Sequence, residues 1–221
     1  MMILHTIGDS HSYAGWQDLV LNNLIIKIHH LGAITCSSFG FNHLDIIKNY
    51  DIYEGEIVCF IFGEIDCRTH MNKHKQYFKE IIDKIVENYF NAIRVNVKDF
   101  QNLTTMVVSV VPPARKESYS DELGIQYGTP TVGEDEDRKI FVKYMNKKIK
   151  ENCKKYNYIY FNIHDKYCDN EGFLNQSLSD KNVHIKDHIY IKEELINLFN
   201  LEHKSKYYED FQLNEFITKW I

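Results

Sequence analysis

Short apolar runs alternate along the chain with longer stretches in which apolar residues recur at helical spacing. The run EIVCFIFGEID at 56–66 is nearly continuous, as in the strands of parallel sheets that are buried on both faces. Residues 13–30 instead carry apolar side chains three and four positions apart, which is the period of one helix face. The pattern predicts strands at 1–7, 31–40, 56–66, 104–115 and 158–167, and helices at 13–30, 41–50, 73–100, 136–156 and 192–199.

This alternation predicts an α/β fold of three layers, α/β/α. Its centre is expected to be a mainly parallel sheet of about five strands, with helices on both faces. Residues 1–200 are expected to form this domain, and the aromatic, amphipathic segment 201–221 to pack on it as an extension. Ligands of such sheets bind outside the carboxyl ends of the strands, so the site is expected there.

Polar residues cluster where three of the predicted strands end, at 8–11, 37–40 and 63–68. The first cluster reads Gly-Asp-Ser-His, and it has two interpretations. Gly8 permits a positive φ and Asp9 or Ser10 can cap a helix, so the cluster can be a plain strand-to-helix turn. Alternatively, it displays Ser10 as a nucleophile whose backbone N–H serves an oxyanion. Convergence of the three clusters on one sheet edge favours a functional site.

Composition narrows the classes of protein. The chain has 221 residues and a formal net charge of −5, which argues against a broad nucleic-acid-binding face. It contains no stretch of membrane-spanning length and no signal-peptide pattern. Its five cysteines are an odd number without CxxC spacing, which favours a reduced, intracellular chain over a disulfide framework or a zinc site. We therefore expect no metal, no cofactor, no nucleic-acid partner and no membrane partner.

A nucleophilic serine needs a base, which is usually a histidine oriented by a carboxylate. The chain has 11 histidines, so the presence of one is not itself a signal. His11 is adjacent to Ser10 and is expected to point elsewhere. His184 lies in the polar stretch SDKNVHIKDH after the last predicted strand, with Asp180 four residues before it. An ordinary loop histidine is the alternative interpretation of His184.

These motifs resemble those of the SGNH/GDSL hydrolases, a large group of esterases and related acyl-group enzymes. IGDSH is similar to their first block, FGEID to their third block and SDKNVHI to their fifth. The resemblance covers nearly the whole chain, roughly residues 2–198. It implies a flavodoxin-like sheet with Ser10 as nucleophile, His184 as general base and Asp180 as the acid that orients it. It also implies an oxyanion hole made by the N–H of Ser10, a glycine N–H after the second strand and an asparagine side chain from block three.

Gly40 is the first candidate for that glycine, with Gly32 behind it. The block-three asparagine is absent, because Ile65 stands in its place and cannot donate a hydrogen bond. Arg68 or His70 could supply the missing donor.

The fifth block departs from the family as well. The family spacing is D-x-x-H, whereas this chain has D-x-x-x-H, and Lys181 stands where the aspartate would be. Asp180 can still reach His184 through a one-residue bulge. Otherwise His184 acts without a fixed partner, or Asp187 assists it from the other side.

Other charged residues near the predicted strand ends are candidates for accessory or substrate-binding roles. Asp9 is expected to hold the first turn through backbone amides, and Asp66 to bond loop amides beneath the site. Arg68 and Arg115 could bind an anionic part of a substrate, although a surface ion pair is the commoner role of such residues. The accessory set is Asp9, His11, Glu64, Asp66 and Arg68.

Three functions are compatible with these residues. The first is a serine esterase acting on small acyl esters, with O-acetyl groups of a carbohydrate as one possibility. The second is an acyltransferase that passes the same acyl group to an alcohol or amine. The third is a non-catalytic SGNH-like module that binds a glycan or a protein, which the missing asparagine favours. Oligomeric state is not encoded in any of these patterns.

Overall fold

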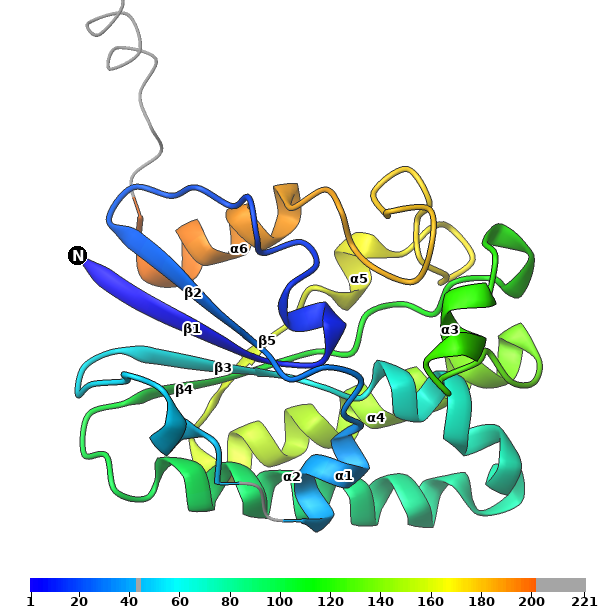
Figure 1. The fold of residues 1–221 in the computed structure, drawn as a ribbon, viewed down its shortest axis with the longest axis horizontal. Coiled ribbons are helices and arrows are strands. Elements are labelled where there is room, and N and C mark those ends of the chain that lie inside the picture. The colour runs from blue at the N-terminus through cyan, green and yellow to red at the C-terminus, as the bar shows by residue number, and fades with distance from the viewer. Residues whose placement is uncertain (43–44, 202–221) are drawn as a thin grey trace, which may run out of the picture.

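The computed structural model describes residues 1–42 and 45–201, and a five-stranded sheet of parallel strands forms its centre (Figure 1). The strand order is β2-β1-β3-β4-β5, the flavodoxin-like order, so the predicted α/β fold is confirmed. The predicted extension at 201–221 lies, apart from Leu201, outside the described residues. The strands are β1 (Met2–Gly8), β2 (Leu24–His30), β3 (Ile57–Ile61), β4 (Thr104–Val108) and β5 (Ile159–Phe161).

Helices cover both faces of this sheet, which gives the predicted three layers (Figure 1). One face carries α1 (Cys36–Phe41), α2 (Phe78–Val97) and α4 (Asp135–Tyr156). The other carries α5 (His164–Tyr167) and α6 (Ile189–Phe199), while α3 (Glu122–Gln126) lies near the carboxyl ends of the strands. Short 3-10 or π turns occur at η1 (Ser10–Ser12), η2 (Ile47–Asn49), η3 (Asp66–His70), η4 (Met71–Tyr77) and η5 (Lys116–Ser118).

Strand β3 shows how the sequence divides the core into two halves. Its side chains alternate between faces, and all five are buried, which explains the continuous apolar run. Val58 and Phe60 pack in the cluster formed with α1, α2 and α4. Cys59 and Ile61 pack on the opposite side, in the cluster that includes residues of α5 and α6.

Three of the predicted elements are wrong, and all lie between β1 and β3. In the described part of 41–50, where a helix is expected, the structure has only the last residue of α1 and the 3-10 turn η2. Where a helix is expected at 13–30, the last seven residues form strand β2. Where a strand is expected at 31–40, the second half belongs to helix α1. Residues 24–30 are rich in isoleucine, and they pair with the full length of β1, which overrides their helix-like spacing. Asn23 turns the chain into this strand with a φ of 61°. As a consequence, the loop that leaves the edge of the sheet after β2 is 31–35 and not 37–40.

Gly8 ends β1 at the point where the chain must pass close to β3. A Cβ at this position would overlap the carbonyl group of Ile61, so only glycine fits. This close approach brings the residues that follow Gly8 beside those that follow β3. The candidate site lies where these two strands end, at the switch point of the strand order.

A histidine pair on the neighbouring strands β1 and β2 predicts loss of stability in acid. His5 Nδ1 lies 2.9 Å from His29 Nε2, and His5 Nε2 lies 2.9 Å from Glu56 Oε2. Burial, with a smaller contribution from His5, lowers the pKa of His29 to about 4. Below about pH 6.5 the unfolded chain therefore binds a proton at His29, whereas the folded chain does not bind it until the pH falls to about 4. We expect the free energy of unfolding to fall by about 2 kcal/mol over this window, after allowance for partial exposure.

Urea unfolding of the wild type and His29→Gln at pH 7 and pH 4.5 measures this effect. The glutamine variant should lose less stability on acidification, whereas His74→Gln, at an exposed position, should behave like the wild type. Equal pH dependence in the wild type and His29→Gln would contradict the prediction.

Candidate active site

Ser10 begins a single 3-10 turn directly after β1. Asp9 caps this turn: its Oδ1 accepts a hydrogen bond from the His11 N–H at 2.9 Å. The predicted cap is therefore Asp9 rather than Ser10. The Ser12 hydroxyl donates to the Asp9 carbonyl at 2.8 Å and closes the turn from below. This local bonding leaves the half-buried Ser10 side chain at the carboxyl edge of the sheet.

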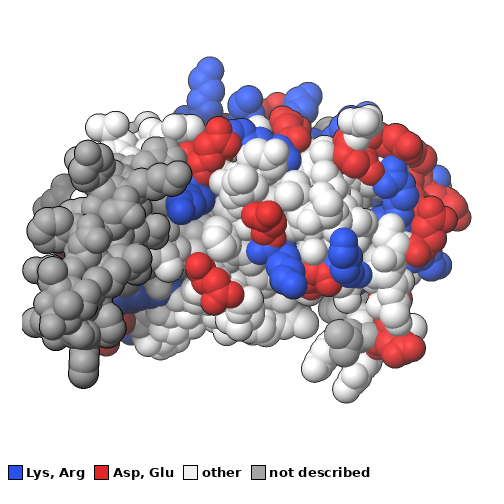
Figure 2. Space-filling model, turned by 90° about the horizontal axis from the view of Figure 1, so that it is seen from above, with Lys and Arg blue, Asp and Glu red and all other residues white. Residues whose placement is uncertain are grey.

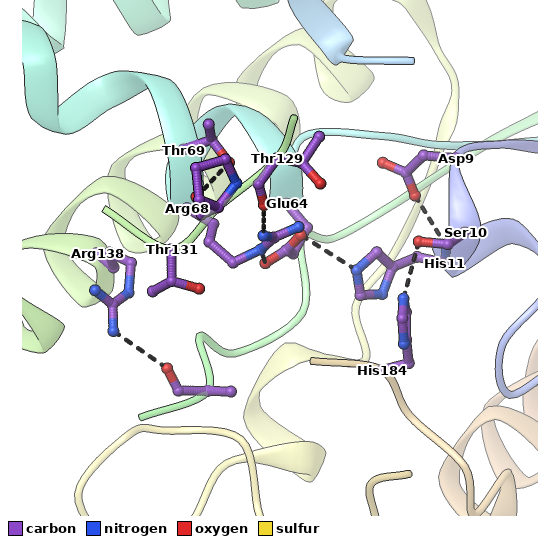
Figure 3. Close-up of polar contacts among 12 residues, drawn as sticks. Asp9, Ser10, His11, Glu64, Arg68, Thr69, Thr129, Thr131, Arg138 and His184 are labelled. Carbon is purple, nitrogen blue, oxygen red and sulfur yellow. Dashed lines mark hydrogen bonds and ion pairs between the residues drawn. The ribbon is translucent and has the colours of Figure 1, made fainter. Parts of the chain in front are cut away.

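His184 contacts Ser10 although 174 residues separate them in the chain (Figure 3). The distance between His184 Nε2 and Ser10 Oγ is 2.9 Å. On the other side of the ring, His184 Nδ1 lies 2.8 Å from Asp180 Oδ2. The three predicted residues thus form one continuous chain of hydrogen bonds, in the order serine, histidine, carboxylate.

The turn from Asp180 to His184 accommodates the extra residue in D-x-x-x-H. Lys181 takes the left-handed conformation, with a φ of 68°, and the Asp180 N–H donates to the His184 carbonyl at 3.0 Å. Asp180 Oδ1 also accepts from the N–H groups of Asn182 at 2.8 Å and His184 at 3.3 Å. Burial alone would raise the pKa of Asp180, but these hydrogen bonds and the contact with His184 lower it.

Asp187, the alternative partner of His184, has a different contact. Its Oδ1 accepts a hydrogen bond from the Ile189 N–H at 3.0 Å, at the start of α6. Asp180 is therefore the carboxylate that contacts the His184 ring.

Two neighbouring residues of block three, Ile65 and Asp66, point in different directions. Ile65 is buried and lines the pocket beside Ser10. Asp66 turns the other way and accepts hydrogen bonds from the N–H groups of Cys36 at 2.7 Å and Ser37 at 3.0 Å. It therefore holds the start of α1, and burial raises its pKa to about 6.

A pocket of about 440 Å³ opens beside Ser10 and His184. One wall belongs to the stretch between β4 and α4, a region that the sequence pattern left as a polar loop. The only sequence signal for it is the presence of three glycines, at 124, 128 and 133. Apolar and aromatic groups dominate the lining. The lining residues that sequence reasoning missed are His30, Ala33, Tyr119, Asp121, Gly124, Tyr127, Thr129, Asn182 and Val183.

Gly40, the first candidate for the second oxyanion donor, is in the wrong place. It lies inside α1, and a Cβ there would meet the backbone of α2 at Asn88 and Tyr89. Gly40 therefore allows two helices to pack closely and does not line the pocket. Gly32 does line it, in the loop that follows β2. Among the described residues, no acceptor is found for the N–H of Ser10 or of Gly32.

The remaining candidates lie away from the Ser10 hydroxyl. Arg115 Nη1 and Nη2 pair with Asp169 at 2.5 Å and Glu171 at 3.0 Å, outside the pocket. His70 lines a separate hollow between α1 and α2. His70 therefore does not supply the missing block-three donor, whereas Arg68, the other candidate for it, does line the pocket and donates from Nε to Glu64.

Charge is mixed over the face that carries α6, where Lys and Arg alternate with Asp and Glu (Figure 2). Acidic side chains crowd at the end where the strands terminate. The part of the chain that the structure describes holds no group of three or more side chains suited to a metal ion. None of its helices is both long and apolar enough to cross a bilayer.

No protein-family model and no curated protein matches the sequence, whereas solved structures do match the fold. A Streptococcus pneumonia protein described in connection with platelet activating factor has a TM-score of 0.60 at 17% identity, over 88% of this chain and 80% of its own. A lipolytic G-D-S-L family protein from Veillonella parvula has a TM-score of 0.56 at 11% identity, over 90% and 99%. A carbohydrate acetylesterase from Sinorhizobium meliloti has a TM-score of 0.51 at 12% identity, over 90% and 100%.

These similarities show that the chain has the fold of GDSL (SGNH) lipolytic proteins and acylhydrolases. The resemblance inferred from the motifs GDSH, GEID and SDKNVHI is thereby confirmed at the level of fold.

Proposed function

We propose that this protein is a serine ester hydrolase in which Ser10 is the nucleophile, His184 the general base and Asp180 the acid that orients it. The observation that carries the proposal is the unbroken series of contacts from Ser10 Oγ through His184 to Asp180 Oδ2, at 2.9 and 2.8 Å. Both distances suit proton transfer without rearrangement. The fold of GDSL acylhydrolases supports the same assignment.

The reaction follows from these contacts. Ser10 Oγ attacks the ester carbonyl carbon while its proton passes to His184 Nε2, and Asp180 stabilises the resulting imidazolium. The C–O bond to the alcohol then breaks, and the alcohol leaves with the proton held by His184. Water next gives a proton to His184 and attacks the acyl carbon, which releases the carboxylic acid and restores Ser10.

The oxyanion that forms in each step needs donors, and the chain has fewer than the family pattern implies. The N–H groups of Ser10 and Gly32 are proposed as the two donors, because both residues line the pocket and neither N–H has an acceptor among the described residues. Ile65 contributes only an apolar side chain where an asparagine would donate. We therefore expect slow turnover, because one missing donor costs about 10²–10³ in kcat.

Small, uncharged acyl esters suit this pocket best. Its lining is mainly apolar, and Arg68 and Asp121 contribute charges of opposite sign to it. An O-acetylated carbohydrate is one such substrate, and a carbohydrate acetylesterase is among the proteins with this fold.

Two measurements on the purified wild-type protein test the proposal. It should hydrolyse p-nitrophenyl acetate, and a fluorophosphonate probe should label it covalently, with the adduct on Ser10 in the peptide map. A label on another residue would reject Ser10 as the nucleophile.

Restoring the missing donor should accelerate the reaction. Ile65→Asn places an amide where Ile65 lines the pocket, and we expect kcat on p-nitrophenyl acetate to rise by up to about 10²-fold. Ile65→Val, which offers no donor, is the matched control and should show no such gain. A folded asparagine variant with unchanged kcat would indicate that the oxyanion does not form beside position 65.

A binding module is the second candidate, and the buried Ile65 in place of a donor is the observation that favours it. Such a module would show neither probe labelling nor hydrolysis in the wild type, while retaining the fold.

A further inference from the structure

Three buried side chains beside the site take no part in the steps above. His11 Nε2 lies 3.5 Å from Glu64 Oε2, and Glu64 Oε1 lies 2.7 Å from Arg68 Nε (Figure 3). All three side chains are at most 10% exposed. They form a line that ends at the base, because the rings of His11 and His184 have centroids only 4.8 Å apart.

Glu64 is shared between a permanent cation and a group that can become one. Burial by itself would raise the pKa of Glu64, but Arg68 and His11 outweigh it and lower the pKa, so the side chain is a carboxylate. Burial lowers the pKa of His11, against the opposing effect of Glu64. The other ionisable neighbours of His11 are His184 and Asp9, and burial raises the pKa of Asp9.

The charge on His11 matters because of its neighbour. His184 must become a cation when Ser10 attacks, and a second cation one ring away would oppose that step. A neutral His11 does not oppose it. The negative charge of Glu64, in turn, favours a protonated His11 unless another cation balances it.

We propose that Arg68 is a positioning residue that neutralises Glu64, so that His11 stays uncharged beside His184 and His184 can carry the proton. The consequence for catalysis rests on the proposed function, whereas the charge state of His11 does not. Arg68 is suited to this task because it is always protonated and its guanidinium is held in place. It donates from Nη1 to the Thr129 carbonyl, and its own carbonyl accepts from the Val132 N–H at 3.1 Å.

The direct test is a histidine titration by NMR on the folded, full-length protein. Its signals are followed in the wild type, Arg68→Met, Glu64→Gln and the double variant Glu64→Gln/Arg68→Met, and the His11 signal is assigned by its loss in His11→Gln. Arg68→Met leaves Glu64 unbalanced, so the His11 midpoint should move upward by about 1 pH unit or more. Removing both partners should return it to the wild-type value or below.

Glu64→Gln alone supplies an independent arm if Arg68→Met does not fold. It leaves Arg68 as an unbalanced cation near His11, so the midpoint should fall below that of the wild type. Arg115→Met, in an ion pair outside the pocket, is the matched arginine control and should leave the midpoint unchanged. An unmoved midpoint in Arg68→Met, a raised midpoint that persists in the double variant, or a raised midpoint in Glu64→Gln would overturn the proposal.

Kinetics separate the electrostatic role from a merely structural one. In Arg68→Met, kcat should fall by up to about tenfold for each pH unit by which His184 loses basicity, and the double variant should recover it. Arg68→Met and the double variant both lose the hydrogen bond to the Thr129 carbonyl. A change in KM that is common to both variants therefore reports on the pocket wall and not on the charge of Glu64. Absence of hydrolysis in the wild type would refute the esterase proposal and leave the titration result standing.

Discussion

Ser10→Ala should lower kcat for p-nitrophenyl acetate by about 10⁶-fold and abolish labelling by a fluorophosphonate. The hydroxyl is the only group placed both at the pocket and within 2.9 Å of His184 Nε2 in the described structure, so no neighbouring side chain can replace it. Alanine removes the Oγ atom alone. The turn is held by Asp9 and Ser12, and their hydrogen bonds do not involve the Ser10 hydroxyl.

Steady-state hydrolysis and mass spectrometry of the labelled protein measure this effect. Ser38→Ala is the matched control, because its hydroxyl accepts only from Asn42 Nδ2 on α1 and lies outside the pocket beside Ser10. Hydrolysis that survives Ser10→Ala at the wild-type rate would reject the serine mechanism altogether.

Asp180→Asn is expected to have the next largest effect, a loss of about 10⁴-fold in kcat. Asp180 Oδ2 accepts a hydrogen bond from the N–H at His184 Nδ1 and thereby leaves Nε2 free to take the proton of Ser10. An asparagine amide in the same place can donate to Nδ1, which favours the tautomer with its hydrogen on Nε2. That tautomer cannot act as a base toward Ser10.

Asp187→Asn controls for charge alone, since Asp187 bonds the Ile189 N–H and not the histidine ring. Its kcat should stay within about threefold of the wild type, as expected of a surface change that leaves the reacting groups in place. Equal losses in the two variants would show that Asp180 acts through net charge rather than through the His184 tautomer.

The part of the fold that sequence predicted best is the part governed by burial. Strand β3 is continuous in apolar residues because both faces of the sheet are covered, and that signal is hard to mistake. The prediction for residues 24–30 was wrong because this half-buried strand, which pairs with β1 alone, has no continuous apolar run. Its isoleucines at 25, 26 and 28 also fit one face of a helix. Only the pairing with β1 decides between them, and pairing is not visible in a local pattern.

The same error explains why Gly40 was misplaced. With α1 taken as a strand, Gly40 stood at a strand end, while Gly32 stood near the beginning of the element. The contacts among Ser10, His184 and Asp180 could be predicted because motifs in strand-end loops point to these residues without the strand boundaries being right. The pocket wall at 119–129 was not, because a loop without periodicity gives no indication of which surface it covers.

The ion pair between Glu64 and Arg68 could in principle be predicted from the sequence. The two residues are four apart at a helical turn, the spacing at which opposite charges meet. The contact of Glu64 with His11 could not be predicted in this way, because it depends on how closely β1 and β3 approach each other at Gly8.

The short turn from Asp180 to His184 also bears on how such a protein could change over evolution. The proposed acid and the proposed base lie within five consecutive residues, closed by a bridge between Ser179 and Ile185, whereas the proposed nucleophile lies in the turn after β1. A single substitution of Asp180 or of His184 inside this turn would break the series of contacts to Ser10 without touching the sheet. A lineage of this chain could therefore exchange catalysis for binding in a single mutational step, and its Ser10 would remain as an inherited trace of the former reaction.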